Sequence, residues 1–250
     1  MKKQHSRPAL LVTFVTAVAI LLGMATPAQA VTPMQVVNAV KDAYEAYQKL
    51  NNNQFTLQQA TDQIISRIEQ VEDHIIDHID LIAAADIEAC SLSAVDLVSS
   101  LPSMTPTAKQ IFAFNTTDCV NKAKTFVNAA SSKAAIDHVG YALHAVGPIA
   151  LIARKHAGLS EGTLRTNIIG ASNTVISKLN PSCQATPLWG DSLPGGWVEV
   201  RLSCTAFNGN VGATHVLAQQ PFPVWNYSVP RAAAMVGTSW QLSMAAAPVI

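Results

Sequence analysis

The stretch Val139-Gly-Tyr-Ala-Leu-His-Ala-Val-Gly-Pro-Ile-Ala-Leu-Ile-Ala153 has no formally charged side chain, and Arg154-Lys155-His156 follows it immediately. A run of this length is too short to cross a bilayer as one straight helix, which takes about 20 residues. A helix that is apolar on all sides is typical of the centre of a folded domain. The run therefore predicts the central helix of a helical bundle, from Lys133 to about His156, kinked at Pro148.

A second interpretation of the same run is that it enters a membrane after the protein rearranges. Apolar side chains such as Leu143, Ile149 and Leu151 would then contact lipid. Long amphipathic helices around an apolar segment are similar to the architecture of helical pore-forming toxins, although no motif of such a family carries the likeness. This analogy implies a membrane-active helical protein as an alternative function.

Two amphipathic helices are predicted on the N-terminal side of this run. Apolar residues recur every three or four positions from Met34 to Tyr47, which is the spacing of one helix face. Thr56 and Gln59 resemble a capping box that opens the next helix, and the same spacing continues to Ile82. We expect this second helix to run from Thr56 to about Ala89. At 1.5 Å per residue it would be about 50 Å long and would pack lengthwise in a bundle or coiled coil.

Shorter helices are expected on either side of the central one. Their predicted ranges are Val95–Leu101, Pro106–Phe114, Asp118–Ala130 and Glu161–Leu179. Proline or glycine separates several of them, which is how helix ends are usually marked. Residues 31–181 are therefore predicted to form one domain, a long, mostly antiparallel bundle of five to six helices.

The amino-acid usage changes after about residue 181. All four tryptophans lie in residues 182–250, together with only four formally charged side chains. Trp197 to Cys204 alternates between apolar and polar residues, as a half-buried strand does. Thr214–Ala218 and Ser239–Met244 are shorter strand candidates. The predicted fold is thus mainly α, with a small β-rich subdomain at residues 182–250 stapled by a disulfide.

The N-terminal residues 1–30 have the composition of an export signal. Lys2, Lys3 and Arg7 precede an apolar stretch from Ala9 to Ala25, and Ala28-Gln29-Ala30 is a small-x-small cleavage pattern. An uncleaved membrane anchor is the alternative, because the apolar stretch approaches the length of a short span. We expect cleavage after Ala30 and a secreted or cell-envelope protein.

An even number of cysteines in an exported chain predicts disulfides. We expect the pairs Cys90–Cys119 and Cys183–Cys204, because each pair lies within one compositional region. A zinc site is the competing interpretation, but no Cys-x-x-Cys or Cys-x-His spacing is present.

Composition excludes some classes of protein. The chain has 49% hydrophobic residues, and its 16 basic side chains equal its 16 acidic ones. Such a chain is not a disordered tail, and it has no basic excess for a nucleic-acid partner. A protein or envelope component is the expected partner, membrane contact is an alternative, and the oligomeric state is left open.

Gly190-Asp191-Ser192-Leu193 resembles the signature of the GDSL-type esterases and lipases. The resemblance implies a nucleophile at Ser192 and a base from a downstream Asp-x-x-His. No Asp-x-x-His follows Ser192, and His215 is the only later histidine. We therefore expect a polar turn before the strand at Trp197 and a protein that is not an enzyme, with a GDSL-like esterase as the last alternative.

His74 and His78 are the candidate metal ligands, because they lie four residues apart and share a helix face. A zinc or copper site would need a further ligand from another helix. The alternative is the polar flank of a long amphipathic helix. We expect His74 and His78 to lie on such a polar flank, and we expect no bound metal and no other cofactor.

The leading functional prediction is an exported, non-enzymatic binding or structural protein. The region rich in tryptophan and proline would present the recognition surface. Its candidate contact residues are Trp189, Trp197 and Trp225.

Overall fold

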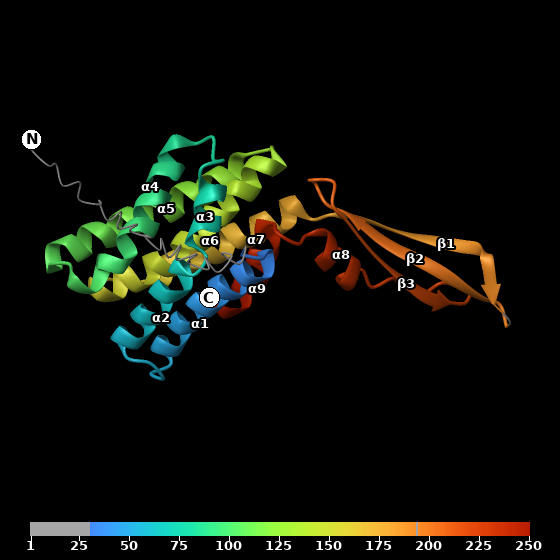
Figure 1. Ribbon diagram of the computed structural model, residues 1–250, viewed down its shortest axis with the longest axis horizontal. Coiled ribbons are helices and arrows are strands. Elements are labelled where there is room, and N and C mark those ends of the chain that lie inside the picture. The colour runs from blue at the N-terminus through green and yellow to red at the C-terminus, as the bar shows by residue number, and fades with distance from the viewer. Residues whose placement is uncertain (1–30, 194) are drawn as a thin grey trace, which may run out of the picture. The chain divides into compact units, whose positions relative to one another are not determined.

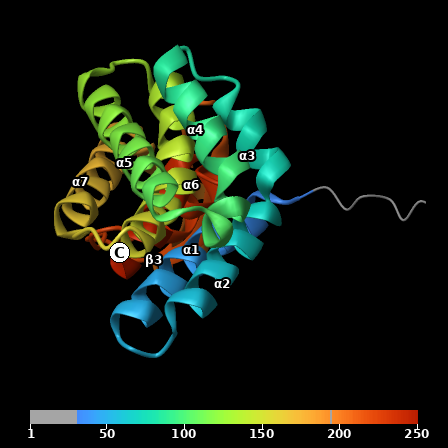
Figure 2. The same ribbon diagram turned by 90° about the vertical axis from the view of Figure 1, so that its left-hand side faces the viewer.

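Helix α6 (Lys133–His156) lies at the centre of the helical part of the structure, as the sequence predicts (Figure 1). The computed structural model describes residues 31–193 and 195–250, without the side chains of 189–193. Every residue from Val139 to Ala153 is buried, and the helix continues through Pro148. Helices α1 to α5, α7 and α9 all contact α6. Figure 2 shows α6 enclosed among its neighbours.

The described residues are mainly helical. The helices around α6 are α1 (Pro33–Asn51), α2 (Leu57–Glu69), α3 (Glu72–Ile79), α4 (Ala85–Leu97), α5 (Pro106–Ala129), α7 (Gly162–Leu179) and α9 (Ser239–Ala246). A further helix, α8 (Ser228–Ala234), lies beside the sheet. Two 3-10 helices, η1 (Val98–Ser103) and η2 (Ala247–Val249), follow α4 and α9. The predicted capping box of Thr56 and Gln59 is present at the start of α2, and Thr32 with Gln35 forms another at α1.

The prediction of one long helix from Thr56 to about Ala89 is wrong. That region forms α2, α3 and α4, so the long helix on which a coiled coil would depend is not present. The spacing of apolar residues does not reveal the breaks between α2, α3 and α4, because buried residues recur every three to five positions across both. These residues are Ile64, Ile68, Val71, Ile75, Ile79, Ile82 and Ile87. Acidic residues in the first turns of α3 and α4 favour the new helix starts, because carboxylates stabilise helix N-termini.

Two other predicted helices are a single helix in the structure. The ranges Pro106–Phe114 and Asp118–Ala130 both belong to α5. Thr116 and Thr117, in the expected gap, donate their hydroxyls to carbonyl oxygens one turn earlier, so their polar groups are satisfied inside the helix. The predicted helix Val95–Leu101 is the end of α4 followed by η1.

Three antiparallel strands form the sheet, in the order β1 (Ser182–Leu193), β2 (Trp197–Thr205) and β3 (Val211–Ala218). The alternation predicted for β2 is confirmed, because Val198, Val200 and Leu202 are buried. The tetrad 190–193 is the end of β1 and not the expected turn, because Leu193 pairs with Trp197 in the sheet. Helix α8 contacts β2 and β3.

The segment Ser239–Met244 is the start of helix α9 and not the strand that we predicted. The buried residues of α9 are Ser239, Trp240, Leu242, Ser243 and Ala246, which is compatible with helical spacing. Two of these five are serines, which a sequence pattern counts as exposed. The spacing of apolar residues alone therefore could not predict the buried face of α9, because Ser239 and Ser243 are buried through hydrogen bonds to Asp137 and His144.

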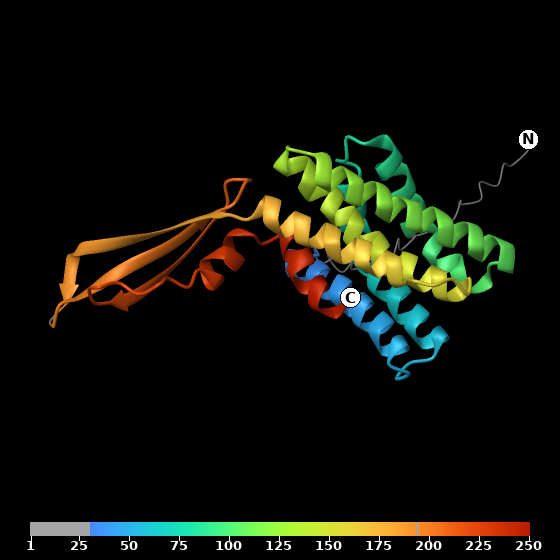
Figure 3. The ribbon, with the colours of Figure 1, turned by 180° about the vertical axis from the view of Figure 1, so that it is seen from behind.

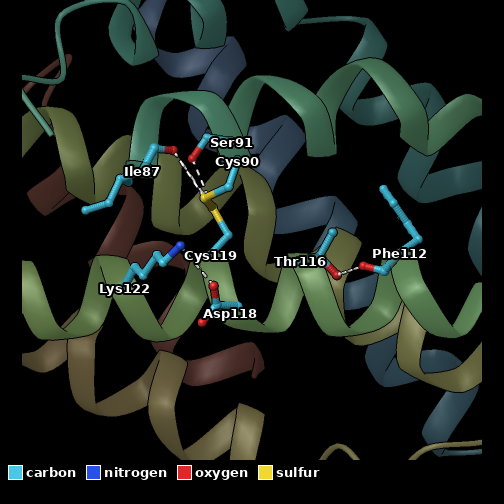
Figure 4. The surroundings of a disulfide bond; sticks show 8 residues. All are labelled: Ile87, Cys90, Ser91, Phe112, Thr116, Asp118, Cys119 and Lys122. Atoms are coloured by element: carbon cyan, nitrogen blue, oxygen red, sulfur yellow. Dashed lines mark hydrogen bonds and ion pairs between the residues drawn. A yellow bond between two sulfur atoms is a disulfide. The ribbon is translucent and has the colours of Figure 1, made fainter. Parts of the chain in front are cut away.

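Both predicted disulfides are present. Cys90–Cys119 joins α4 to α5 with a Cα–Cα distance of 5.7 Å, and Figure 4 shows it between the two helices. Cys183–Cys204 joins β1 to β2 at directly opposite positions of the sheet. Two disulfides indicate an oxidising, extracellular type of environment. Residues 31–250 form one compact unit.

Candidate functional site

The sheet has one covered face and one uncovered face. On the covered face Val200, Leu202 and Ala218 form a small apolar cluster. Partly buried residues that follow β3, among them Phe222 and Trp225, pack against this cluster. Because successive side chains of a strand point to opposite faces, the residues between these buried ones lie on the other side of the sheet.

The uncovered side is called here the outer face of the sheet. It consists of Trp197, Glu199, Arg201, Ser203 and Thr205 from β2 with Val211, Ala213, His215 and Leu217 from β3. Trp197 is 42% exposed, Val211 is 58% exposed and Leu217 is 56% exposed, so this face carries several large exposed apolar side chains. Next to Trp197 and Leu217 on this face, Glu199 Oε1 lies 2.5 Å from His215 Nδ1.

The three tryptophans predicted as one contact surface are not all brought together. Trp197 lies on the outer face, whereas Trp225 packs on the covered face with its ring centroid 5.6 Å from that of Phe222. Trp189 lies in β1, and its side chain is outside the described residues. Of the three tryptophans predicted to form a contact surface, Trp197 is the one whose described side chain lies on the outer face.

The residues of the esterase alternative are only partly described. Ser192 lies in β1, and its side chain is among those outside the description. His215 Nδ1 bonds to Glu199 on the outer face, so this nitrogen is already engaged. Leu143, Ile149 and Leu151, the candidate membrane contacts, are each 0% exposed and lie in the core. Lys133–His156 is the helix of the described chain that is long and apolar enough to cross a membrane, and 89% of its most apolar window is buried.

The structure brings a third histidine to the candidate metal pair. The ring of His78 lies 4.8 Å from His74 and 6.2 Å from His138 of α6, and 3.8 Å from Tyr141, measured between centroids. His78 Nδ1 bonds to the carbonyl oxygen of His74, and burial lowers the pKa of His78. Within the described residues no three His, Cys, Asp or Glu side chains are placed to hold a metal ion.

Two polar contacts in the core fix α6 against α9. Asp137 Oδ1 accepts hydrogen bonds from the backbone N and the Oγ of Ser239, at 2.7 and 2.9 Å. His144 Nε2 lies 2.7 Å from Ser243 Oγ. Complete burial lowers the pKa of His144 to about 3, so its imidazole is neutral at neutral pH.

Two cavities were not expected from the sequence. One, of about 520 Å³, lies between α4 and α5 near the disulfide in Figure 4, and its Lys122 and Asp118 neutralise each other at 3.0 Å. The other, of about 470 Å³, lies between α1, α7, α8 and α9 and is called the C-terminal cavity. Its wall includes Val37, Ile176 and Met244, which come from three distant parts of the chain. The only signal in the sequence was Arg231, a rare charge in the last part of the chain.

The chain matches no protein-family model, and no curated protein or solved structure is significantly similar to it. Its function is therefore argued from the residues and their arrangement.

Proposed function

We propose that this chain is an exported, non-enzymatic binding protein that contacts a protein or an envelope component through the outer face of its sheet. The supporting observation is the contrast between the two faces. One is covered by the chain's own residues, and the other exposes Trp197 and Leu217 beside charged groups. Large exposed apolar side chains with polar neighbours are typical of interaction sites.

The proposed location follows from the sequence and the disulfides together. Residues 1–30 carry the export signal described above and lie outside the described residues, with cleavage after Ala30. Cys90–Cys119 and Cys183–Cys204 need an oxidising compartment to persist. In this proposal the helices form an antiparallel bundle that supports the sheet in a secreted or envelope-bound protein.

The outer face has the chemistry of a contact centre. Trp197 offers a large amphipathic ring, and tryptophan is enriched among residues that dominate binding energy. Arg201 lies directly opposite His215 in the strand register, and Glu199 lies opposite Leu217. Both charge signs therefore lie beside apolar surface, which favours a partner with complementary charges over a purely apolar one.

The test is a binding measurement on the oxidised chain that begins at Val31. Co-sedimentation with envelope fractions is measured for the wild type and for a variant with Trp197→Ala and Leu217→Ser. We expect saturable binding by the wild type and at least tenfold weaker binding by the variant, because the exposed side chains of Trp197 and Leu217 are lost from the outer face.

A matched control removes apolar surface elsewhere. Val224 is fully exposed and lies after β3, outside the outer face, so Val224→Ser should leave binding unchanged. Equal binding by the wild type and the outer-face variant would remove the outer face from the proposal.

A second candidate function, a membrane-active helical protein, is supported by α6. Neither disulfide involves this helix, so no covalent link holds it in the core. Burial lowers the pKa of His78 and His156 as well as that of His144, and each of these side chains lies on α6 or on a helix packed against it. Acid would favour rearranged states in which these histidines are exposed and protonated, and it would in this way weaken the packing around α6.

Flotation and dye release with anionic vesicles at pH 7.5 and pH 5 test this second candidate. Leakage at pH 5 alone, reduced in His144→Asn, is the expected result if α6 enters the bilayer. Protein that stays at the bottom of the gradient with dye retained at both pH values would eliminate the candidate.

A further inference from the structure

Arg231 of α8 lines the C-terminal cavity without a partner for its charge. Its Nε is buried and unbonded, and no ion pair or hydrogen bond of its guanidinium is present among the described residues. No carboxylate is among the described residues that line the cavity. By contrast, Arg67 pairs with Asp42 at 3.1 Å, and the Nε of Arg165 donates to the carbonyl oxygen of Ile250 at 2.8 Å.

Trp240 of α9 also lines this cavity and has an unsatisfied donor of its own. It is only 6% exposed, and no acceptor is present for its buried Nε1–H in the described part of the chain. Buried N–H groups are nearly always hydrogen-bonded in folded proteins, so orphaned donors on two residues that line one cavity need an explanation. An acceptor that carries a negative charge would satisfy both the hydrogen bonds and the guanidinium charge.

Apart from the neutral polar residues Asn180, Ser228 and Gln241, the rest of the cavity wall is apolar and favours a ligand with an apolar part. Val37 of α1, Ile176 of α7, and Met244 and Ala245 of α9 are among its lining residues. Figure 3 shows these three helices side by side, with α7 in yellow-orange, α9 in red and α1 in blue. Its volume of about 470 Å³ is in the range of small-ligand pockets, which is roughly 300–1,000 Å³.

We propose that the C-terminal cavity binds a small amphipathic carboxylate of the medium-chain fatty-acid class. The carboxylate accepts hydrogen bonds from the Arg231 guanidinium and from Trp240 Nε1, and the alkyl chain lies against Val37, Ile176 and Met244. One arginine balances one negative charge, and its planar fork matches a carboxylate. A phosphate dianion would leave charge uncompensated, because Arg231 is the one cation among the described residues of the cavity wall.

Access to this site does not require the core to open. Met244 is 47% exposed, and Ser228 and Ala232 are also exposed, so one side of the cavity meets solvent. The site is independent of the outer face of the sheet, since its residues belong to helices and to Asn180. Failure of the proposed binding surface would therefore leave this inference intact.

Isothermal titration of the oxidised chain from Val31 with sodium decanoate, decanol and decylamine tests the head-group preference. These probes share one alkyl chain and differ in charge. We expect saturable one-to-one binding of decanoate, at least tenfold weaker binding of decanol, and no binding of decylamine. Across octanoate, decanoate and dodecanoate, affinity should rise by about fourfold for each methylene that becomes buried.

Variants locate the site. Arg231→Gln should weaken decanoate binding at least tenfold, whereas Arg231→Lys should retain the preference for decanoate over decanol. Trp240→Phe keeps the ring and removes the N–H, and it should weaken decanoate binding several-fold. Arg201→Gln makes the same change on the outer face of the sheet and should have no effect, which makes it the matched control.

Three outcomes would overturn the inference. They are no saturable decanoate binding by the wild type, equal affinity for decanoate and decanol, and decanoate binding that survives Arg231→Gln in a variant with an unchanged circular dichroism spectrum. If Arg231→Gln fails to fold, Arg231→Lys and Trp240→Phe decide the question through the ratio of decanoate to decanol affinity.

Discussion

Buried polar side chains hold α6 at defined points. Asp137 near its N-terminal end binds both donors of Ser239, and His144 in its middle binds Ser243. A buried histidine with a neutral ring is compatible with the apolar core only while it stays unprotonated. These contacts therefore connect the stability of the core to pH.

We predict that acid destabilises the protein through His144. Its pKa is about 3 in the folded chain and about 6.5 when unfolded. Between these values the unfolded state binds the extra proton, so the free energy of unfolding falls as pH falls, by about 1.4 kcal/mol per pH unit for this one group. His78 and His156, whose pKa values are also lowered, act in the same direction.

Urea denaturation of wild type and His144→Asn from pH 7.5 to pH 4 checks this prediction. The variant should show a shallower loss of stability below pH 6.5. Burial raises the pKa of Asp137, which works in the opposite direction and limits the loss at the lowest pH values. Parallel stability curves for the two proteins would contradict the assignment to His144.

At the scale of helices, glycines mark where α6 contacts its neighbours most closely. A Cβ added at Gly140 would lie 2.6 Å from the Cβ of Ser239, which cannot move without moving α9. A Cβ added at Gly170 in α7 would meet nothing within 4 Å. The same substitution should therefore have opposite effects at the two positions.

We predict that Gly140→Ala destabilises the fold by about 1–3 kcal/mol, because overpacking displaces α9 and strains the bonds to Asp137. Gly170→Ala should stabilise it by up to about 1 kcal/mol, since alanine is the better helix former. Thermal and urea denaturation of both variants provide the check. An unchanged or raised stability of Gly140→Ala would show that α9 does not pack as described.

The sequence predicted those elements whose buried residues are apolar. The run Val139–Ala153 predicted the central helix, and the alternation after Trp197 predicted β2. The spacing of apolar residues failed to predict α9, because two of its buried residues, Ser239 and Ser243, are polar. The breaks between α2, α3 and α4 were hidden for a different reason, because the apolar spacing continues through them.

Apart from the rare charge of Arg231, nothing in the sequence indicated the C-terminal cavity. Val37, Ile176, Arg231 and Trp240 meet through the packing of four helices that are far apart in the chain. Periodicity describes one element at a time and says nothing about which faces of different elements enclose a space. The outer face was anticipated only through Trp197, because the placement of Trp225 depends on the course of the chain after β3.

At the scale of the whole molecule, the two disulfides tie different parts of the fold. Cys90–Cys119 closes a loop between α4 and α5 with a sequence separation of 29, and Cys183–Cys204 closes one in the sheet with a separation of 21. Each crosslink restricts the unfolded chain and so stabilises the fold, by about 3–4 kcal/mol on the loop-entropy model.

We predict that replacing Cys90 and Cys119 together by alanine lowers the free energy of unfolding by about 3 kcal/mol. Replacing Cys183 and Cys204 together should lower it by a similar amount. Chemical denaturation under oxidising conditions gives both values, and the reduced wild type serves as the comparison. A variant as stable as the oxidised wild type would show that its crosslink restrains little of the unfolded chain.

The central position of α6 also sets the order of events when the chain is made. Its partners α1 and α9 lie on opposite sides of it in the sequence, and the bonds from Asp137 and His144 reach residues 102 and 99 positions later. A ribosome must finish almost the entire chain before α9 can cover this helix. Until then the nascent polypeptide holds its most apolar segment uncovered and has no completed core. That delay fits the export proposed above, in which the chain would cross a membrane unfolded and would fold and form its disulfides on the far side.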